Sequence, residues 1–177
     1  MPKVDAGKLV FLDESGVNTN MSRRYARSII GQRANDAIPL NTGKSTTILS
    51  SVRLDGTIVP VLFTGAVNRD RFLDYLKEHL VPTLQPGDLV IMDNLRTHKV
   101  DGVATLIQSA GAVPVYLPPY SPDLNPIEEM WSKIKAYLRK VKARSSDLLV
   151  QAIKDAFSTV SVSDIFAWFE HAGYSCS

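Results

Sequence analysis

The stretch LVFLD at residues 9–13 and its counterpart LVIMD at residues 89–93 decide the expected fold of this 177-residue chain. Each is a run of four apolar residues followed by an aspartate. Such a run is typical of a β-strand that is buried on both faces. Open α/β sheets build their sites beyond the carboxyl ends of their strands. We therefore expect Asp13 and Asp93 to lie on neighbouring strand ends.

Around these two strands, the hydrophobic pattern predicts one α/β domain over residues 1–177, with a mixed central sheet flanked by helices. The pair Asp55-Gly56 suits a two-residue hairpin turn. Residues 15–44 are polar and rich in arginine, and only a strand near Tyr25 is suggested there. The other expected elements, in chain order, are strands over 8–13, 46–54 and 57–64, a helix over 69–80, a strand over 89–93, a helix over 100–110, a strand over 113–117, and helices from 126, over 146–158 and over 163–171.

Composition narrows the class of protein. Apolar residues make up 45% of the chain and charged residues 21%, as in ordinary globular domains. No run approaches the ~20 apolar residues that cross a bilayer, and the start of the chain lacks a signal-peptide pattern. We therefore expect a cytoplasmic protein without membrane contact. Cys176 is the single cysteine, which excludes a disulfide or a thiolate zinc site within one chain.

Glu128 adds a third carboxylate to Asp13 and Asp93. Carboxylate oxygens are the ligands that Mg²⁺ and Mn²⁺ prefer, and clustered carboxylates repel one another unless cations neutralise them. Two such ions ~3.5–4 Å apart activate a nucleophile and stabilise the leaving oxygen of a phosphodiester. The spacing alone does not choose between Glu128 and Glu129, or between Asp13 and Glu14. The alternation of side chains along a strand puts Glu14 on the opposite side from Asp13. Each aspartate alone also suits the start of a loop.

The helix that carries Glu128 has a well-defined expected start. Asn125 suits the N-cap, Pro126 the first helical position, and Glu128 the glutamate of a capping box. This gives Glu128 a purely structural alternative role. An apolar stripe follows at helical spacing and is expected to pack on the sheet, with Trp131 as a core residue. The stripe consists of Ile127, Met130, Trp131, Ile134, Leu138 and Val141.

Three motifs carry a resemblance to a known family. They are DESG at residues 13–16, MDN at residues 92–94 with His98 beyond it, and YSPDLNPIE at residues 120–128. Together they resemble the catalytic domain of mariner-like transposases, most of all the bacterial insertion-sequence branch, over residues 8–142. The resemblance implies an RNase H-like fold in which two aspartates and a glutamate bind two Mg²⁺ or Mn²⁺ ions. By motif position, the catalytic and metal-binding residues are Asp13, Asp93 and Glu128, with Asn94 and His98 as supporting residues.

The resemblance also implies a reaction. Water attacks a phosphodiester at a transposon end, and the freed 3′ hydroxyl then attacks target DNA, usually at a TA dinucleotide. Proteins of this family act as dimers or larger assemblies, so we expect a homodimer that works on double-stranded DNA at the bacterial nucleoid. Their N-terminal helix-turn-helix modules have no counterpart here, which suggests a separately encoded partner or an isolated catalytic fragment. The alternatives are an RNase H-like endonuclease without strand transfer and a catalytically silent DNA-binding or assembly module.

Positive charge is concentrated in two segments, although the net charge is only +2. Residues 133–144 carry six Lys or Arg and residues 23–33 carry four, with no acidic residue in either segment. Basic residues seven, eleven and fourteen positions after Glu128 lie on its face of the helix, where they suit a DNA backbone that enters the site. The alternative is that these charges only keep a helix and a loop soluble. The expected DNA-binding residues are Lys133, Lys135, Arg139 and Lys142.

Overall fold

A computed structural model of the chain describes residues 5–22, 25, 27–33, 35, 38, 45–94, 99–119 and 121–176. In these parts of the chain, five strands form one mixed sheet in the order β3-β2-β1-β4-β5. β1 runs antiparallel to β2 and parallel to β4, β3 is antiparallel to β2, and β5 is parallel to β4. The strands are β1 (Leu9–Val17), β2 (Thr46–Arg53), β3 (Val61–Thr64), β4 (Leu89–Met92) and β5 (Val113–Tyr116).

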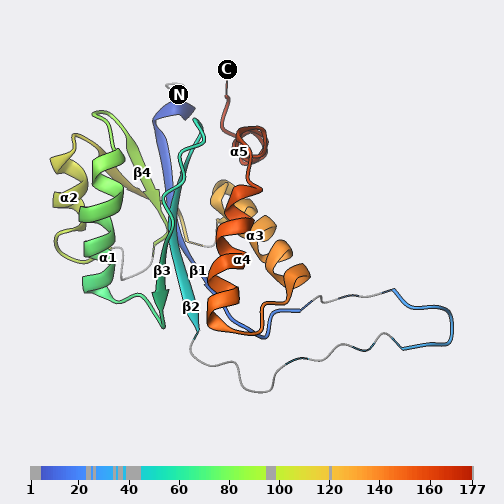
Figure 1. The fold of residues 1–177 in the computed structure, drawn as a ribbon. Coiled ribbons are helices and arrows are strands. Elements are labelled where there is room, and N and C mark those ends of the chain that lie inside the picture. Colours follow the sequence, from blue (N-terminus) through green and yellow to red (C-terminus); the bar gives the residue numbers. More distant parts are fainter. Residues whose placement is uncertain are drawn as a thin grey trace.

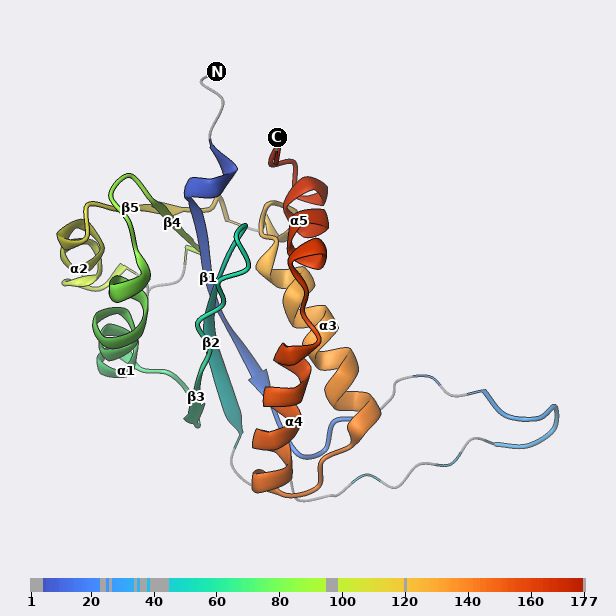
Figure 2. The ribbon, with the colours of Figure 1, turned by 45° about the horizontal axis from the view of Figure 1, so that its top comes forward.

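Helices cover both faces of the sheet. α1 and α2 lie on one face, and α3, α4 and α5 lie on the other (Figures 1 and 2). None of the helices in the described residues is long and apolar enough to cross a bilayer. The helices are α1 (Arg69–Tyr75), continued by a π-helical turn (Leu76–Leu80) and a 3₁₀ turn (Val81–Thr83), α2 (Val103–Ser109), α3 (Ile127–Val141), α4 (Ser146–Ser158) and α5 (Val162–His171).

The side chains of β1 alternate between two hydrophobic cores. Leu9 and Phe11 pack in the core below α3, α4 and α5, whereas Val10 and Leu12 pack in the core below α1 and α2. All four are buried, and burial of such a side chain stabilises the fold by about 1.5–3 kcal/mol. Asp13 has the parity of Leu9 and Phe11, so its carboxylate points towards the layer of α3.

The first strand is longer than the sequence predicts. β1 continues four residues past Asp13 to Val17, and this part pairs with β2, from Asp13 opposite Ser50 to Val17 opposite Thr46. The prediction of a strand that ends at Asp13 is therefore wrong. It followed the apolar run, but the polar end of β1 is held by backbone pairing with β2, which leaves no apolar signal. Tyr25 itself is exposed and is not in a strand, whereas residues 23, 24 and 26 beside it lie outside the described residues, so a strand near Tyr25 stays a prediction.

The predicted hairpin is confirmed in part. Its turn includes Asp55-Gly56 as expected, but the loop has three residues, 54–56, because Arg53 pairs with Thr57. Gly56 has a φ of 94°, in the left-handed region that glycine adopts readily. The return strand is shorter than predicted: Ile58 forms only an isolated bridge to Val52, and β3 begins at Val61. The predicted helices over 146–158 and 163–171 agree with α4 and α5 to within one residue.

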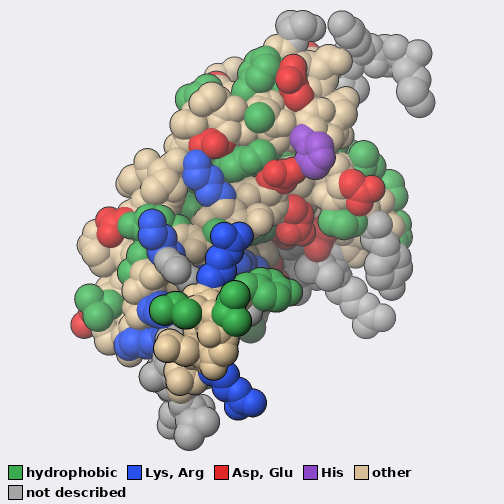
Figure 3. Space-filling model, turned by 90° about the vertical axis from the view of Figure 1, so that its right-hand side faces the viewer, with side chains coloured by type: hydrophobic (Ala, Val, Ile, Leu, Met, Phe, Trp, Pro, Cys, Tyr) green, Lys and Arg blue, Asp and Glu red, His purple; other side chains and the backbone are tan. Residues whose placement is uncertain are grey.

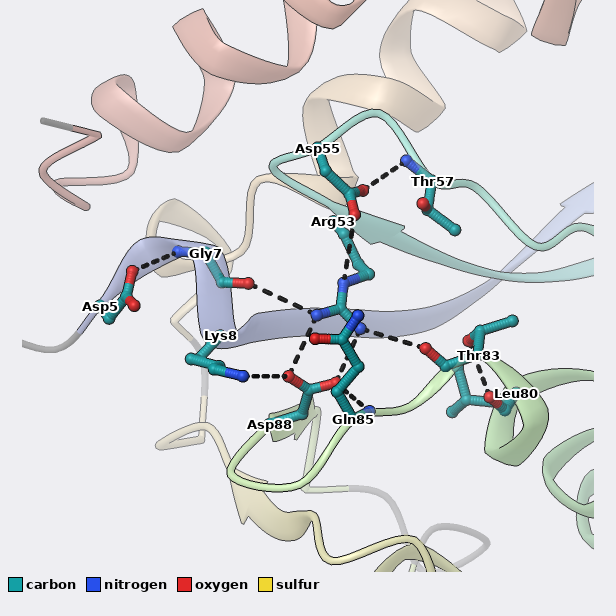
Figure 4. A network of polar contacts seen from close by, with 10 residues as sticks. All are labelled: Asp5, Gly7, Lys8, Arg53, Asp55, Thr57, Leu80, Thr83, Gln85 and Asp88. Atoms are coloured by element: carbon teal, nitrogen blue, oxygen red, sulfur yellow. Dashed lines mark hydrogen bonds and ion pairs between the residues drawn. The ribbon is translucent and has the colours of Figure 1, made fainter.

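A buried ion pair closes the end of the sheet where β1 and β4 begin (Figure 4). Arg53 donates to both carboxylate oxygens of Asp88, over 2.7 Å from Nη1 and 3.0 Å from Nη2. Asp88 is 0% exposed and Arg53 is 5% exposed. Nη1 also donates to the carbonyl oxygen of Thr83 over 3.3 Å. The pair therefore ties the end of β2 to the loop before β4, although the two residues are far apart in sequence.

Candidate active site

The parallel pairing of β1 with β4 places two aspartates next to each other. The last residues in register are Leu12 and Met92. Asp13 and Asp93 follow these residues directly, so their Cα atoms continue the same register. Both aspartates have the parity that faces α3, because side chains alternate along each strand. The sheet thus brings together two residues that lie far apart in the sequence.

The Asp13 carboxylate is almost completely buried. It is 7% exposed, and its Oδ2 accepts a hydrogen bond of 3.0 Å from Nε1 of Trp131 on α3. Its pKa is raised from 3.8 to about 7, mainly by burial and to a smaller extent by the negative charges of Glu128 and Asp93. Hydrogen bonds from the Glu14 backbone and from Trp131 oppose this increase. Glu128 and Asp93 therefore lie near enough for their charges to act on Asp13.

Glu128 and Asp93 line one cleft of about 390 Å³. Asp13 does not line this cleft, and the charge of Glu128 acts on its pKa. The cleft lies between the end of β4, the segment before α3 and the first turn of α3. Prolines at positions 118, 119 and 122 form much of its apolar wall. Its polar lining comes from Asp93, Asn94, Ser121, Asn125 and Glu128. Asn94 is therefore in the cleft, whereas His98 lies outside the described residues.

The two adjacent glutamates of α3 point to different neighbours. Glu129 contacts Nδ1 of His171 on α5 through its Oε1. Glu128 lines the cleft and acts on the pKa of Asp13. Glu14 has the parity of Leu12 and so belongs to the opposite face of β1. Of these alternatives, only Glu128 lines the cleft with Asp93, so the geometry favours it over Glu129 and Glu14.

The start of α3 differs from the predicted capping box. Pro126 is the N-cap, and no side chain of the described residues caps the helix there. Asn125 instead accepts the Glu128 N–H through its backbone carbonyl, over 3.1 Å. Its own side chain is 6% exposed, and its Oδ1 has no hydrogen-bond partner in the described part of the chain. The predicted reciprocal cap is thus wrong, because the proline turn places the Asn125 side chain against the cleft wall.

The donor set suits a hard divalent cation. Asp13, Asp93 and Glu128 offer only carboxylate oxygens, the ligands that Mg²⁺ and Mn²⁺ prefer. As arranged here, no three acidic, histidine or cysteine side chains among the described residues are close enough to hold a metal ion. The residues therefore fit the cation by chemistry, and binding requires them to move closer together. Oδ2 of Asp13 already has Trp131 as its donor, so Oδ1 is the oxygen without that donor.

The basic residues of α3 separate into two groups. Lys135, Arg139 and Lys142 are half-buried, and Lys142 ends the helix at a φ of 56°. Lys133 instead donates to Oδ2 of Asp164 on α5 over 2.6 Å, which holds the pKa of Asp164 at about 2. Figure 3, which views the side of α3, α4 and α5, shows Lys and Arg side chains gathered next to a group of acidic ones.

Trp131 makes a contact with the candidate site that the sequence does not predict. Its position in the apolar stripe correctly predicts a core residue, and it is 3% exposed. The stripe does not predict what its N–H binds, because the acceptor, Asp13, comes from another element. One signal was available: Trp131 lies three residues after Glu128, which places both on adjacent turns of one side of the helix.

Comparison with known proteins agrees with this geometry. The solved structures that are similar include the Mos1 transposase paired-end complex with left transposon end (TM-score 0.75, 17% identity, 93% of this chain and 52% of that chain). They also include the Mos1 mariner paired-end complex with Mn (TM-score 0.71, 18%, 93% and 52%) and that with Mg (TM-score 0.69, 21%, 93% and 53%). This chain thus spans about half the length of the Mos1 chains that it matches.

At these identities the likeness shows the fold, and the predicted RNase H-like fold is confirmed. No curated protein matches the chain. The assignment of this chain to the bacterial insertion-sequence branch of mariner-like transposases stays a prediction. The DDE superfamily endonuclease family matches residues 8–150, a stretch that contains Asp13, Asp93 and Glu128. Because this match covers most of the sequence, the chain belongs to the DDE superfamily endonuclease family.

Proposed function

We propose that residues 1–177 form the catalytic domain of a metal-dependent DNA transposase. The domain hydrolyses a phosphodiester at the end of a mobile element and joins the resulting 3′ hydroxyl to target DNA. The observation that carries this proposal is the register that sets Asp13 next to Asp93, together with the cleft that Asp93 and Glu128 both line. The membership of the DDE superfamily endonuclease family supports the same chemistry.

In this proposal, Asp13, Asp93 and Glu128 are the catalytic residues and hold two Mg²⁺ or Mn²⁺ ions. When bound, the ions activate the attacking oxygen and stabilise the leaving oxygen of the phosphodiester. Asp13 is paired within the sheet and Asp93 directly follows β4, so we assign them to the rigid side of the site. Glu128 lies on the first turn of a helix after a proline-rich segment, so it provides the adaptable side. Asn94, which lines the cleft with Asp93, is a supporting residue that orients the bound groups, and by motif position His98 has the same role.

The substrate of this domain is double-stranded DNA, and its target is a TA dinucleotide. Lys135, Arg139 and Lys142 extend along α3 from Glu128, which gives backbone phosphates a path of positive charge towards the cleft. Lys133 is held by Asp164, so we expect its contribution to DNA binding to be the smallest of the four. We further propose that the domain acts as a homodimer, in the cytoplasm at the nucleoid.

Charge reversal along this path is expected to weaken DNA binding. The double variant Lys135→Glu with Arg139→Glu removes two phosphate contacts, so the slope of log affinity against log salt should fall by about 2. Filter binding of a short duplex at several salt concentrations measures this slope. Lys140→Glu is the matched control, because it makes the same change on an exposed side of α3. An equal slope for the double variant and the control would remove this path from the proposal.

Joining of a pre-cleaved DNA end tests the proposed reaction. The wild-type chain is incubated with Mn²⁺, a labelled duplex that ends in a 3′ hydroxyl, and a supercoiled plasmid. We expect the label to become covalently attached to the plasmid, and the attachment to disappear in the Asp93→Asn variant and without metal. Asp123→Asn, a change of an exposed carboxylate close to α3, should retain activity.

Each alternative function gives a different result in this experiment. A plasmid that is nicked without acquiring the label would indicate an endonuclease that lacks strand transfer. A plasmid that is neither nicked nor labelled, together with no heat of Mn²⁺ binding, would indicate a silent DNA-binding or assembly module. Normal joining by the Asp93→Asn variant would show that the assigned site is wrong.

A further inference from the structure

Trp131 makes a polar contact inside the hydrophobic core. Its ring packs edge-on against Phe157 of α4, with ring centroids 6.4 Å apart and an interplanar angle of 83°. Its Nε1 reaches across the boundary between α3 and β1 and donates to Oδ2 of Asp13 over 3.0 Å. A buried indole N–H needs an acceptor, and here that acceptor is a carboxylate of the proposed site.

The contact holds a carboxylate that also accepts a hydrogen bond from the Glu14 backbone. Asp13 lies in the interior of β1 and is 7% exposed, so water cannot solvate both of its oxygens. A hydrogen bond to an ionised carboxylate is shorter and stronger than one between neutral groups. The donor is also pre-positioned, because the packing of a rigid indole against Phe157 leaves it few orientations. The indole therefore fixes the rotation of the Asp13 carboxylate about its Cβ–Cγ bond.

The same helix carries both Trp131 and Glu128. Glu128 lies in the first turn of α3 and Trp131 follows three residues later. Glu128 lines the cleft, whereas Trp131 holds Asp13 from behind. A displacement of α3 would therefore move one proposed ligand and release the orientation of another. This couples the two sides of the site through one rigid element.

We propose that Trp131 is a positioning residue of the metal site, whose indole N–H engages Oδ2 of Asp13 and leaves Oδ1 for a divalent cation. The inference rests on the proposed function, since it assigns Trp131 a role towards the same cation. The contrasting view is that Trp131 only fills the core and donates to the nearest acceptor. The two views differ in what loss of the N–H does to metal affinity at constant packing.

Removal of the N–H without loss of the aromatic ring provides the test. Trp131→Phe removes the donor, and Trp168→Phe makes the same change in the second of the two tryptophans, on α5. Loss of a hydrogen bond that orients a metal ligand typically lowers metal affinity about 10–100-fold. Calorimetric titration with Mn²⁺ should therefore show at least about a 10-fold loss for Trp131→Phe and none for Trp168→Phe. DNA nicking by Trp131→Phe should recover at high Mn²⁺, since the ligands themselves remain.

Two further measurements keep the outcome clear. If Trp131→Phe does not fold, replacing Trp131 by benzothienylalanine exchanges only the N–H for sulfur and keeps the bicyclic ring. In the Trp168→Phe protein, Trp131 is the single remaining tryptophan of the 177-residue sequence. Mn²⁺ bound at Asp13 should quench its fluorescence, and the Mn²⁺ concentration at half-maximal quenching should agree with the dissociation constant from calorimetry.

The outcomes separate this inference from the proposed function. Equal Mn²⁺ affinity of the wild type and a folded N–H-deficient variant would overturn the positioning role and leave the proposed function intact. Absence of Mn²⁺ binding by the wild type, with or without DNA, would overturn both. A weakened affinity in the N–H-deficient variant alone, with an unchanged Trp168→Phe protein, is the result that we expect.

Discussion

Replacing Asp13 by asparagine is expected to stabilise the metal-free protein at pH 8 by up to about 4 kcal/mol while it reduces DNA cleavage to background. Burial raises the pKa of Asp13 from 3.8 to about 7. A pKa difference of about 3 between the folded and unfolded states corresponds to about 4 kcal/mol. Asparagine removes the buried charge and still offers an oxygen to the Trp131 N–H. It also removes a carboxylate of the proposed metal site, which is why activity is lost.

The effect on stability has a defined dependence on pH. Below about pH 4 the carboxyl is protonated in both the folded and the unfolded state. Its ionisation then contributes no difference between the free energies of unfolding of the wild type and the variant. Between pH 4 and 7 the folded state retains a proton that the unfolded state has released, so the stability of the wild type falls as the pH rises. Above pH 7 both states are ionised, and the difference stays at its maximum.

Urea unfolding in the presence of EDTA at pH 4, 6 and 8 measures this difference, since other titrating groups are common to the two proteins. At pH 8 the variant should unfold about 10 °C higher in a thermal scan, given about 2–4 °C per kcal/mol for a chain of this size. Asp123→Asn, at an exposed carboxylate, is the matched control. A variant that is no more stable than the wild type at pH 8 would show that Asp13 is not held as a buried acid.

Replacing Asp88 by asparagine is expected to destabilise the fold by about 3–5 kcal/mol, because it leaves the Arg53 guanidinium buried without its counterion. The loss includes the charged acceptor of the Gln85 backbone N–H, which donates to Asp88 over 2.7 Å. Arg53 is 5% exposed, so water replaces the missing partner poorly. The ion pair of Arg53 and Asp88 lies where β1 and β4 begin, whereas the proposed metal site lies beyond the end of β4. The metal affinity of the folded variant should therefore be unchanged.

The free energy of unfolding in urea at pH 7 checks this expectation. Asp55→Asn is the control, because Asp55 contacts the same arginine at 3.8 Å from an exposed position and should contribute less than about 1 kcal/mol. The double variant Arg53→Met with Asp88→Leu removes both charges and should recover part of the stability. A loss below 1 kcal/mol for Asp88→Asn would mean that Arg53 does not depend on Asp88.

The sequence was sufficient for the parts of the site that local patterns encode. Two apolar runs of equal length ending in Asp13 and Asp93 suit parallel strands in register, and the structure pairs them in that way. The proline-rich segment before Glu128 predicted a helix start, and α3 begins there. Local patterns also placed α4 and α5, because their apolar faces repeat at helical spacing.

The parts that sequence reasoning missed depend on partners from elsewhere in the chain. The end of β1 is polar and becomes a strand because β2 pairs with it. Arg53 and Asp88 have no shared local pattern, although they form a buried pair. The acceptor of the Trp131 N–H likewise comes from a strand more than a hundred residues earlier. Contacts of this kind follow from the packed fold and leave no periodic signal.

The position of Asp13 within β1 has a consequence for local opening. Its backbone lies in the centre of the sheet, paired with β2 on one side and next to the end of β4 on the other. Amide hydrogens at such a position exchange with solvent only when most of the molecule unfolds. The first turn of α3 opens by fraying of a single helix end, which requires much less free energy. Local opening at Asp13 thus requires about as much free energy as unfolding of the whole domain. Thermal fluctuations will therefore open the proposed site at Glu128 first.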